Sequence, residues 1–430
     1  MGCGTSWLTS HLSLSSGSAG LTRWRIRGGR LRSDAGRGEA TPLRVLLHYP
    51  ILNAGGAERS TLRLLAALAG RGCEVHLVLT VAGGRLEPEI DPRVVVHHLR
   101  DMAGAFPAKV SGVGDAFRFA LAGITWVRGR LQQTWRSMRI ARIDFDAAIA
   151  GLHGLSPGFI CKIVRATRRF VMVRNDAADD RQGKLARNIA RYEPCIDGYV
   201  CVSQSVLDSL VAFYPQTRAK AVRIYNLIDP ESMRTGAVQG SDPFELEPAG
   251  LRVLSVCRLQ ESQKALLRMV EIHARLLEAG FAHVWHVLGD GPDRVLLESE
   301  VKQRDVSATF KLHGAIRNPL PYYMHADICA VLSRYEGLCG VVNEARVLER
   351  PVIATRFAGI EEQIESGVNG LIVEQDVKSI CDGLASMIGD EDMRNRLARG
   401  GYPCELLDDD VKIDALLALL GGPRVNADVS

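Results

Sequence analysis

The sequence predicts an α/β protein built from two Rossmann-like, doubly wound domains. From residue 41 onward, short apolar segments of strand length alternate with longer segments of helical period, the pattern of parallel sheets covered by helices. The alternation starts twice, because residues 43–46 and 251–254 open two successive series with the same tetrapeptide, LRVL. A chain of 430 residues with 47% hydrophobic side chains can bury two cores, so we expect a ligand site in an interdomain cleft.

Changes in composition set the expected domain boundaries. Residues 1–40 are rich in Ser, Gly and Arg without a helical period, and we expect a disordered basic extension. An N-terminal Rossmann-like domain over residues 41–235 and a C-terminal domain over residues 251–400 are joined by a linker, 236–250, which is rich in proline and glycine. Residues 401–430 form an acidic C-terminal tail.

Net charge is concentrated in the first 40 residues. They hold six arginines and two acids, so their net charge of +4 equals that of the whole chain, which gives no support for a nucleic-acid partner. The start MGCGTS fits an N-myristoylation pattern, with Cys3 as a second lipid site. A start extended upstream of the domain and a transit peptide are the alternatives, whereas the apolar core of a secretory signal is lacking.

The cysteines and the hydropathy indicate a cytoplasmic protein. The ten cysteines are scattered without a C-x-x-C pair, and several lie in apolar strands, as reduced core thiols do. No segment approaches 18 uncharged apolar residues, so we expect no membrane-spanning helix.

A glycine pair follows the first expected strand. Residues 45–49 lead into a loop in which Gly55 and Gly56 precede an amphipathic helix, and glycines there let a ligand approach the backbone at a helix start. The G-x-G-x-x-G pattern of dinucleotide-binding enzymes is absent. A tight turn that serves packing alone is the alternative interpretation.

Glu336 and Glu344 are eight positions apart and follow an apolar strand at residues 327–332. In a helix, eight residues span about 12 Å, so the two carboxylates suit the two ends of a longer ligand rather than an acid/base pair. Gly337 and Gly340 keep side chains away from the start of the next helix, where unpaired N–H groups favour phosphate. The pattern favours a sugar-diphosphate-ribose site, and a surface helix with two solvated glutamates is the alternative.

Further motifs occur in a fixed order around this pair. The motifs are the strand end VLSVCRL at residues 253–259, Lys264, LGDGP at 288–292, PVIAT at 351–355, Gly359, Glu362 and GVNGL at 367–371. Together they resemble the C-terminal domain of the retaining family-four glycosyltransferases of the GT-B fold, closely over residues 251 to about 375 and more loosely over residues 43–80 and 194–233.

The resemblance implies transfer of a glycosyl group from a nucleoside-diphosphate sugar to a glycan or lipid-linked acceptor, with retention of configuration and without metal or cofactor. It implies that Arg258 and Lys264 stabilise the leaving diphosphate, that Glu336 binds the donor sugar and that Glu344 binds the ribose. The C-terminal domain is then the donor domain and the N-terminal domain the acceptor side. The remaining donor-binding residues implied are Gly55, Gly56, Gly337, Leu338 and Gly340.

The sequence departs from this family pattern in several places. Cys257 and Ala265 replace glycines beside Arg258 and Lys264, and the strand at residues 170–176 lacks the histidine that many members carry. His153 is therefore the candidate acceptor-side catalytic residue, with a structural loop histidine as the alternative. Asp144-Phe145-Asp146 is formally a D-x-D, but it leads into a strand, so we interpret it as solvated acids and expect no metal site.

Residues 100–191 form a basic region inside a neutral body. They contain 17 Lys/Arg and seven Asp/Glu, a net charge of +10. Within them, an expected helix interleaves arginines with apolar residues, a combination that suits an anionic membrane surface or a diphosphate-linked lipid. A cytoplasmic protein that is peripheral on the inner membrane face follows from that interpretation, and a solvated helix face is the alternative.

Two other functions are compatible with the same architecture. A catalytically silent GT-B protein could serve as a binding or scaffold partner, although the presence of Arg258, Lys264 and both glutamates argues against silence. A nucleotide-sugar epimerase or phosphorylase would need an added base or a cofactor lysine that the sequence does not reveal.

Overall fold

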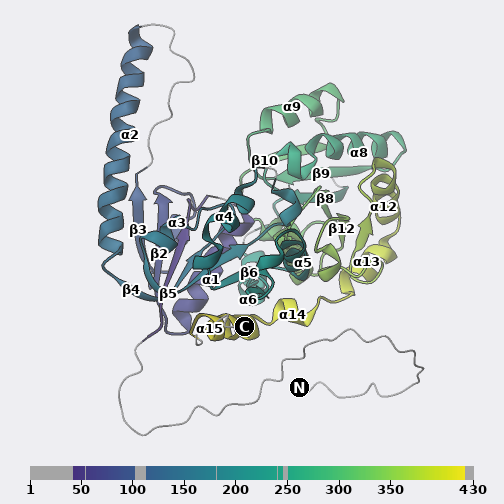
Figure 1. Ribbon diagram of the computed structural model, residues 1–430. Helices are drawn as coiled ribbons and strands as arrows, with labels where there is room; N and C mark the ends of the chain where they lie inside the picture. Colours follow the sequence, from purple (N-terminus) through teal and green to yellow (C-terminus); the bar gives the residue numbers. More distant parts are fainter. Residues whose placement is uncertain are drawn as a thin grey trace, which may run out of the picture. The chain divides into compact units, whose positions relative to one another are not determined.

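The computed structural model describes residues 42–53, 55–101, 113–180, 182–239, 241–245 and 250–421, and side chains within the helix that begins at Val113 are described from residue 127. The expected extension at residues 1–40 lies outside this part of the chain. Two parallel sheets organise the described residues (Figure 1).

The first sheet has seven parallel strands in the order β3-β2-β1-β4-β5-β6-β7. The order reverses between β1 and β4, and in such sheets ligands bind beyond the carboxyl ends of the strands at this point. The strands are β1 (Arg44–Tyr49), β2 (Glu74–Val81), β3 (Val95–Arg100), β4 (Asp144–Ala150), β5 (Arg165–Val173), β6 (Gly198–Cys201) and β7 (Ala221–Arg223).

The second sheet repeats this topology with six parallel strands in the order β10-β9-β8-β11-β12-β13. Its order reverses between β8 and β11. The predicted pair of Rossmann-like, doubly wound domains is therefore confirmed. The strands are β8 (Leu251–Val256), β9 (His283–Leu288), β10 (Phe310–Gly314), β11 (Ile328–Val331), β12 (Val352–Thr355) and β13 (Leu371–Val373).

Helices connect the strands. The α-helices are α1 (Gly56–Gly70), α2 (Val113–Ile140), α3 (Gly158–Lys162), α4 (Lys184–Tyr192), α5 (Gln204–Phe213), α6 (Pro230–Ala237), α7 (Glu261–Lys264), α8 (Leu266–Glu278), α9 (Arg294–Gln303), α10 (Leu320–Met324), α11 (Gly340–Val347), α12 (Val377–Gly389), α13 (Glu391–Arg399), α14 (Cys404–Leu407) and α15 (Asp409–Gly421). The short 3₁₀ helices are η1 (Glu87–Glu89), η2 (Ala177–Asp179), η3 (Glu193–Cys195), η4 (Pro215–Thr217) and η5 (Ile360–Glu362). Among the described residues, no helix combines the length and apolar character needed to cross a bilayer.

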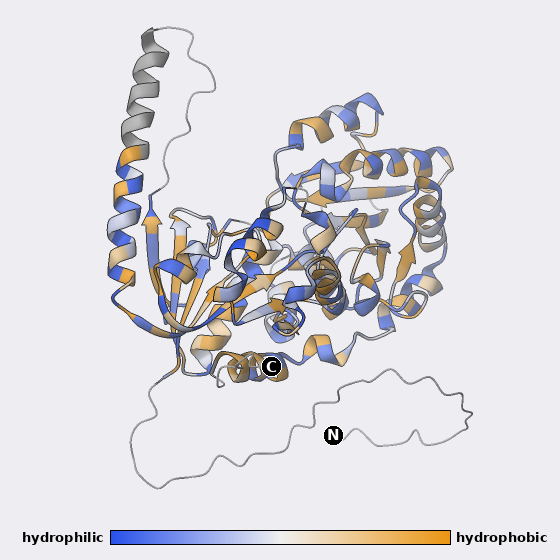
Figure 2. Ribbon diagram, viewed as in Figure 1, coloured by the Kyte–Doolittle hydropathy of each residue, from blue (hydrophilic) through white to orange (hydrophobic). Residues whose placement is uncertain are grey.

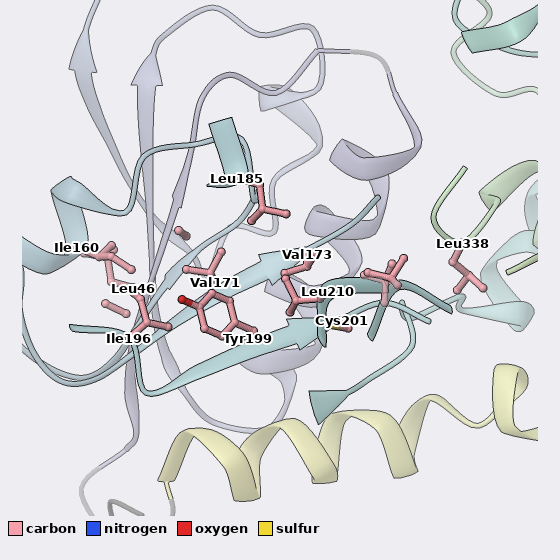
Figure 3. Packing of buried hydrophobic residues seen from close by; sticks show 14 of the residues in the cluster. Leu46, Ile160, Val171, Val173, Leu185, Ile196, Tyr199, Cys201, Leu210 and Leu338 are labelled. Atoms are coloured by element: carbon pink, nitrogen blue, oxygen red, sulfur yellow. The ribbon is translucent and has the colours of Figure 1, made fainter. Parts of the chain in front are cut away.

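Parallel strands buried on both faces account for the continuous apolar runs in the sequence. The central strands appear as hydrophobic bands in Figure 2. Figure 3 shows one cluster of the first domain, in which Val171 and Tyr199 pack between β5, β6 and neighbouring helices. Leu338 and Val347, which follow the second sheet's β11, belong to the same cluster. The two domains thus share apolar packing.

The C-terminal segment returns to the first domain. Residues 401–421, expected as a tail, form α14 and α15, and α15 packs against β4 (Figure 1). Ile413, Leu416 and Leu420 are buried among side chains of the first sheet. At the start of the helix, the Asp409 carboxylate accepts hydrogen bonds from the backbone amides of Ile228 and Asp229.

Truncating a buried side chain of α15 should destabilise the protein. Leu416 is 4% exposed, so Leu416→Ala should lower stability by about 2–5 kcal/mol through lost burial and a residual cavity. Val411 lies on the same helix at 62% exposure, and Val411→Ala should change stability by less than about 0.5 kcal/mol. Thermal unfolding of the two variants measures the difference, and equal melting temperatures would show that α15 does not contribute to the core.

Candidate functional site

Lys264 and Glu336 form an ion pair at the carboxyl ends of two adjacent strands. Lys264 ends α7, which follows β8, and Glu336 lies in the loop after β11. Because β8 and β11 are the neighbours at which the strand order reverses, their following loops meet there. Each side chain is 13% exposed, and Ser333 Oγ lies 3.4 Å from Lys264 Nζ.

The carboxylate keeps Lys264 positively charged. Burial alone would lower the pKa of the Lys264 ammonium, but the adjacent Glu336 carboxylate raises this pKa above its usual value. An ammonium has three N–H donors, and Glu336 and Ser333 occupy two of them. One donor of Lys264 therefore remains for a ligand oxygen.

Two cysteines next to this pair are core thiols. Burial raises the pKa of the Cys257 thiol to about 11 and that of the Cys339 thiol to about 12, so neither is a thiolate at neutral pH. Cys257 stands where the family pattern has glycine. The close backbone contact at this position depends instead on Gly289, in the loop after β9, which lies against the Cys257 carbonyl. A Cβ on Gly289, whose φ is +136°, would lie 1.8 Å from the Cys257 carbonyl oxygen.

Helix α11 presents an open first turn beside the pair. Cys339 precedes the helix without capping it through its side chain, and a Cβ on Gly340 would have no neighbour within 4 Å. Gln363 holds the loop, because its amide accepts a hydrogen bond from the Cys339 N–H at 2.9 Å and donates one to the Cys339 carbonyl at 2.9 Å. Glu344 lies one turn beyond Gly340 and accepts a 2.9 Å hydrogen bond from the Tyr323 hydroxyl.

Gly337 is where the loop after β11 meets the first domain. A Cβ at this position would lie 1.9 Å from the carbonyl oxygen of Arg174, and the Gly337 carbonyl accepts a hydrogen bond from Ser203 Oγ at 3.3 Å. The Leu338 side chain packs in the cluster shown in Figure 3. Any contact of Leu338 with a polar ligand would therefore have to use its backbone.

Arg174 is a buried cation that sequence reasoning did not single out for the site. It is 6% exposed, and its guanidinium donates to the Gly151 carbonyl at 3.0 Å and to the hydroxyls of Ser60 and Thr61 at 3.2 and 3.1 Å. Burial lowers the pKa of Arg174, while Tyr49 and Glu58 raise it. Its partners come from helix α1 and from the loop after β4, which are distant in sequence, so no local motif could have revealed the network.

The glycine pair at the start of α1 accommodates a folded-back carboxylate. Gly55 precedes the helix, and a Cβ there would lie 2.4 Å from Glu58 Oε2, whereas a Cβ on Gly56 would meet nothing within 4 Å. Burial raises the pKa of Glu58, and the nearby charges of Arg174 and Arg258 lower it. The exposed Arg258 of the second domain is thus within electrostatic range of α1 in the first domain.

A second charged residue of α1, Arg63, is within electrostatic range of Glu344. Burial lowers the pKa of Arg63, and the carboxylate of Glu344 is the strongest influence that raises it. Arg63 and Glu58 are both absent from the sequence-predicted site, although Glu58 lies two residues after Gly56. For Arg63, the helical spacing of α1 was the available signal, because positions 56, 59 and 63 are three and four residues apart and lie on one side of the helix.

His153 lies in the loop after β4, at the carboxyl edge of the first sheet. Its Nδ1 accepts a hydrogen bond from the Arg174 backbone N–H at 3.3 Å, and its carbonyl accepts one from Asn188 at 3.0 Å. Burial lowers the pKa of His153 to about 4, so the ring is neutral at pH 7 and carries its proton on Nε2.

The formal D-x-D lies at the opposite end of the same strand. Asp144 begins β4, and Asp146 accepts a 2.7 Å hydrogen bond from the Arg44 backbone N–H. The part of the chain that the structure describes contains no group of three or more His, Cys, Asp or Glu side chains arranged to hold a metal ion.

Comparisons with known proteins identify the family. Residues 250–390 match the family described as Glycosyl transferases group 1, and residues 54–232 match Glycosyltransferase Family 4. The D-inositol 3-phosphate glycosyltransferase of Xylanimonas cellulosilytica is 30% identical over 367 residues, which cover 81% of this chain and 87% of the relative. The lipopolysaccharide core biosynthesis glycosyltransferase LpsE of Rhizobium meliloti is 29% identical over 171 residues, 39% of this chain and about half (49%) of that relative.

A solved structure has the same fold. Anabaena Alr3699/HepE in complex with UDP and glucose superimposes with a TM-score of 0.66 at 16% identity, covering 89% of this chain and all of that chain. The chain belongs to the group 1 and family 4 glycosyltransferases, and the predicted GT-B fold is confirmed.

Gly337, in the loop after β11, and Gly340, the first residue of α11, should respond differently to substitution by alanine. Gly337→Ala forces a methyl group against a backbone carbonyl and should lower stability by about 1–3 kcal/mol. Gly340→Ala adds a methyl group in open space at a helical position and should be neutral or stabilising by up to about 1 kcal/mol. Thermal unfolding provides the measurement. A melting temperature of Gly337→Ala equal to that of the unaltered protein would disprove the close approach to Arg174.

Proposed function

We propose that this glycosyltransferase moves a glycosyl group from a nucleoside-diphosphate sugar to a glycan or lipid-linked acceptor, with retention of anomeric configuration and without a metal ion. The observation that carries the proposal is the Lys264–Glu336 pair beside the open first turn of α11, with Glu344 one turn further along that helix. These groups match, in order, a sugar, a diphosphate and a ribose.

Positive charge for the leaving diphosphate comes from protein groups in this scheme. Lys264 keeps one free N–H donor, Arg258 is exposed, and the N–H groups of the first turn of α11 have no side-chain cap. Arginine binds phosphate through parallel hydrogen bonds, and helix N-termini favour anions. Such fixed donors stabilise the charge that develops on the departing oxygen.

The two glutamates bind hydroxyl groups at the two ends of the donor. One oxygen of Glu344 accepts from Tyr323, which orients the carboxylate and leaves the other oxygen for a ribose hydroxyl. Glu336 is oriented by Lys264 and by Gln263, whose Nε2 lies 3.5 Å from Glu336 Oε2, and it binds the donor sugar. Tyr323 and Gln263 are therefore positioning residues.

The acceptor is bound on the first-domain side. A donor phosphate oxygen takes the acceptor proton on the same face of the sugar from which the diphosphate leaves, which gives retention. His153 is neutral and offers Nε2–H as a hydrogen-bond donor to the acceptor. A glycan or lipid-linked acceptor is supported by relatives such as LpsE, which is named for lipopolysaccharide core biosynthesis.

The nucleotide assignment is tested through Glu344. A thermal-shift panel of UDP, GDP, ADP and CMP first identifies the nucleotide, because a bound ligand raises the melting temperature. Glu344→Ala should then weaken its affinity by about 10- to 100-fold, the loss of a hydrogen bond to a charged group worth about 1.5–3 kcal/mol. Calorimetric titration measures this, with exposed Glu365→Ala as the matched control. Unchanged affinity in Glu344→Ala would remove the ribose assignment.

Metal independence and the role of Lys264 are tested together. Transfer by the unaltered protein should persist in EDTA, and Lys264→Ala should reduce kcat by at least about 100-fold because an electrostatic donor to the leaving group is lost. Lys302→Ala, an exposed lysine on α9, is the control, and circular dichroism checks that each variant is folded. Loss of activity in EDTA that magnesium or manganese restores would contradict the metal-free mechanism.

A further inference from the structure

Helix α2 carries an exposed apolar stripe. Val127, Leu131, Trp135 and Met138 are 50%, 67%, 57% and 52% exposed, and spacings of three and four residues place them on one side of the helix. The opposite side holds the buried Ser137 and Ile140, and α2 packs against β3 there (Figures 1 and 2). Among the residues that the structure describes, nothing covers this stripe, and exposed apolar side chains gathered in this way indicate a binding surface.

Arginines flank the same stripe. Arg128, Arg139 and Arg142 are exposed. Helical spacing places Arg128 and Arg139 on the side of Leu131 and Trp135, and Arg142 lies in the turn that follows Ile140, the last residue of α2. Arg139 lies over the Trp135 ring at 5.2 Å from its centroid. Within the described residues, none of the three arginines forms an ion pair. Arg136, which points to the sheet side, differs because it pairs with Asp101 at 3.0 Å.

The arginines beside the apolar stripe indicate what kind of partner this face binds. A solvated helix face needs no row of large apolar side chains, and a second copy docked through the same face about a two-fold axis would bring the same arginines together. An anionic lipid surface satisfies both features. Apolar side chains enter the boundary between headgroups and acyl chains, tryptophan lies at that boundary, and arginines bind lipid phosphates.

We propose that the α2 face, defined by Val127, Arg128, Leu131, Trp135, Met138, Arg139 and Arg142, docks the protein on a bilayer that contains anionic lipid. The attachment is peripheral, because the apolar stripe covers one side of the helix only. It places the first domain, on which the acceptor is proposed to bind, at the membrane surface. The docking itself does not depend on the transfer reaction, so a failure of the proposed function would leave it unaffected.

Vesicle co-sedimentation of the full chain tests the proposal. Binding to phosphatidylcholine vesicles should rise with added phosphatidylglycerol and fall in high salt, since salt screens the arginines. Leu131→Asp/Met138→Asp and Arg128→Ala/Arg139→Ala should each reduce the vesicle partition coefficient by at least about tenfold. Because every variant keeps residues 1–40, any binding by that basic segment is the same in all samples.

Matched controls separate this face from a general effect of charge. Val295→Asp/Leu296→Asp adds the same two acids to exposed apolar positions on α9, and Arg396→Ala/Arg399→Ala removes two exposed arginines from α13. Both controls should bind vesicles as the unaltered protein does. The proposal is overturned if the unaltered protein does not bind, if the controls lose binding equally, or if the α2 variants instead abolish a dimer detected by sedimentation equilibrium without lipid.

Discussion

The approach of residue 337 to the Arg174 carbonyl is the constraint on which the site depends. A Cβ at position 337 would lie 1.9 Å from that oxygen, so only glycine lets the loop after β11 run against the loop after β5. Ser203 Oγ reinforces the junction by donating to the Gly337 carbonyl. Glu336 precedes this contact directly and α11 begins three residues after it, which ties both proposed donor groups to the first domain.

The carboxylate of Glu362 adds a second link between the two domains. The Glu362 side chain accepts hydrogen bonds from the backbone amides of Gln204 and Ser205 at 2.7 and 2.8 Å and from the Tyr225 hydroxyl at 2.8 Å. An acid at the N-terminus of α5 is stabilised by the unpaired amides and the helix dipole. Glu362 belongs to the second domain, so its family motif has a role in joining the domains in addition to any role near the donor.

The buried cations of the site differ in how many of their N–H donors already have partners in the protein. Arg174 is surrounded by a carbonyl, hydroxyls and the nearby carboxylate of Glu58, which fixes its guanidinium as a structural cation. Lys264 has fewer partners and keeps a donor, and Arg258 is exposed. The distinction between a satisfied cation and an available one separates residues that hold the site together from residues suited to bind phosphate.

Local sequence patterns determined the two α/β domains, the glycine pair at the start of α1 and the order of motifs around Glu336 and Glu344. Strand and helix periods and glycine positions depend on neighbours in the chain, so a single sequence reveals them. Tertiary structure alone decided that Lys264 pairs with Glu336, that Arg174 is buried, that Arg63 lies within range of Glu344 and that α15 returns to the first sheet. These relations join residues distant in sequence, and they arise because strand order, rather than sequence order, brings the carboxyl ends of the sheets together.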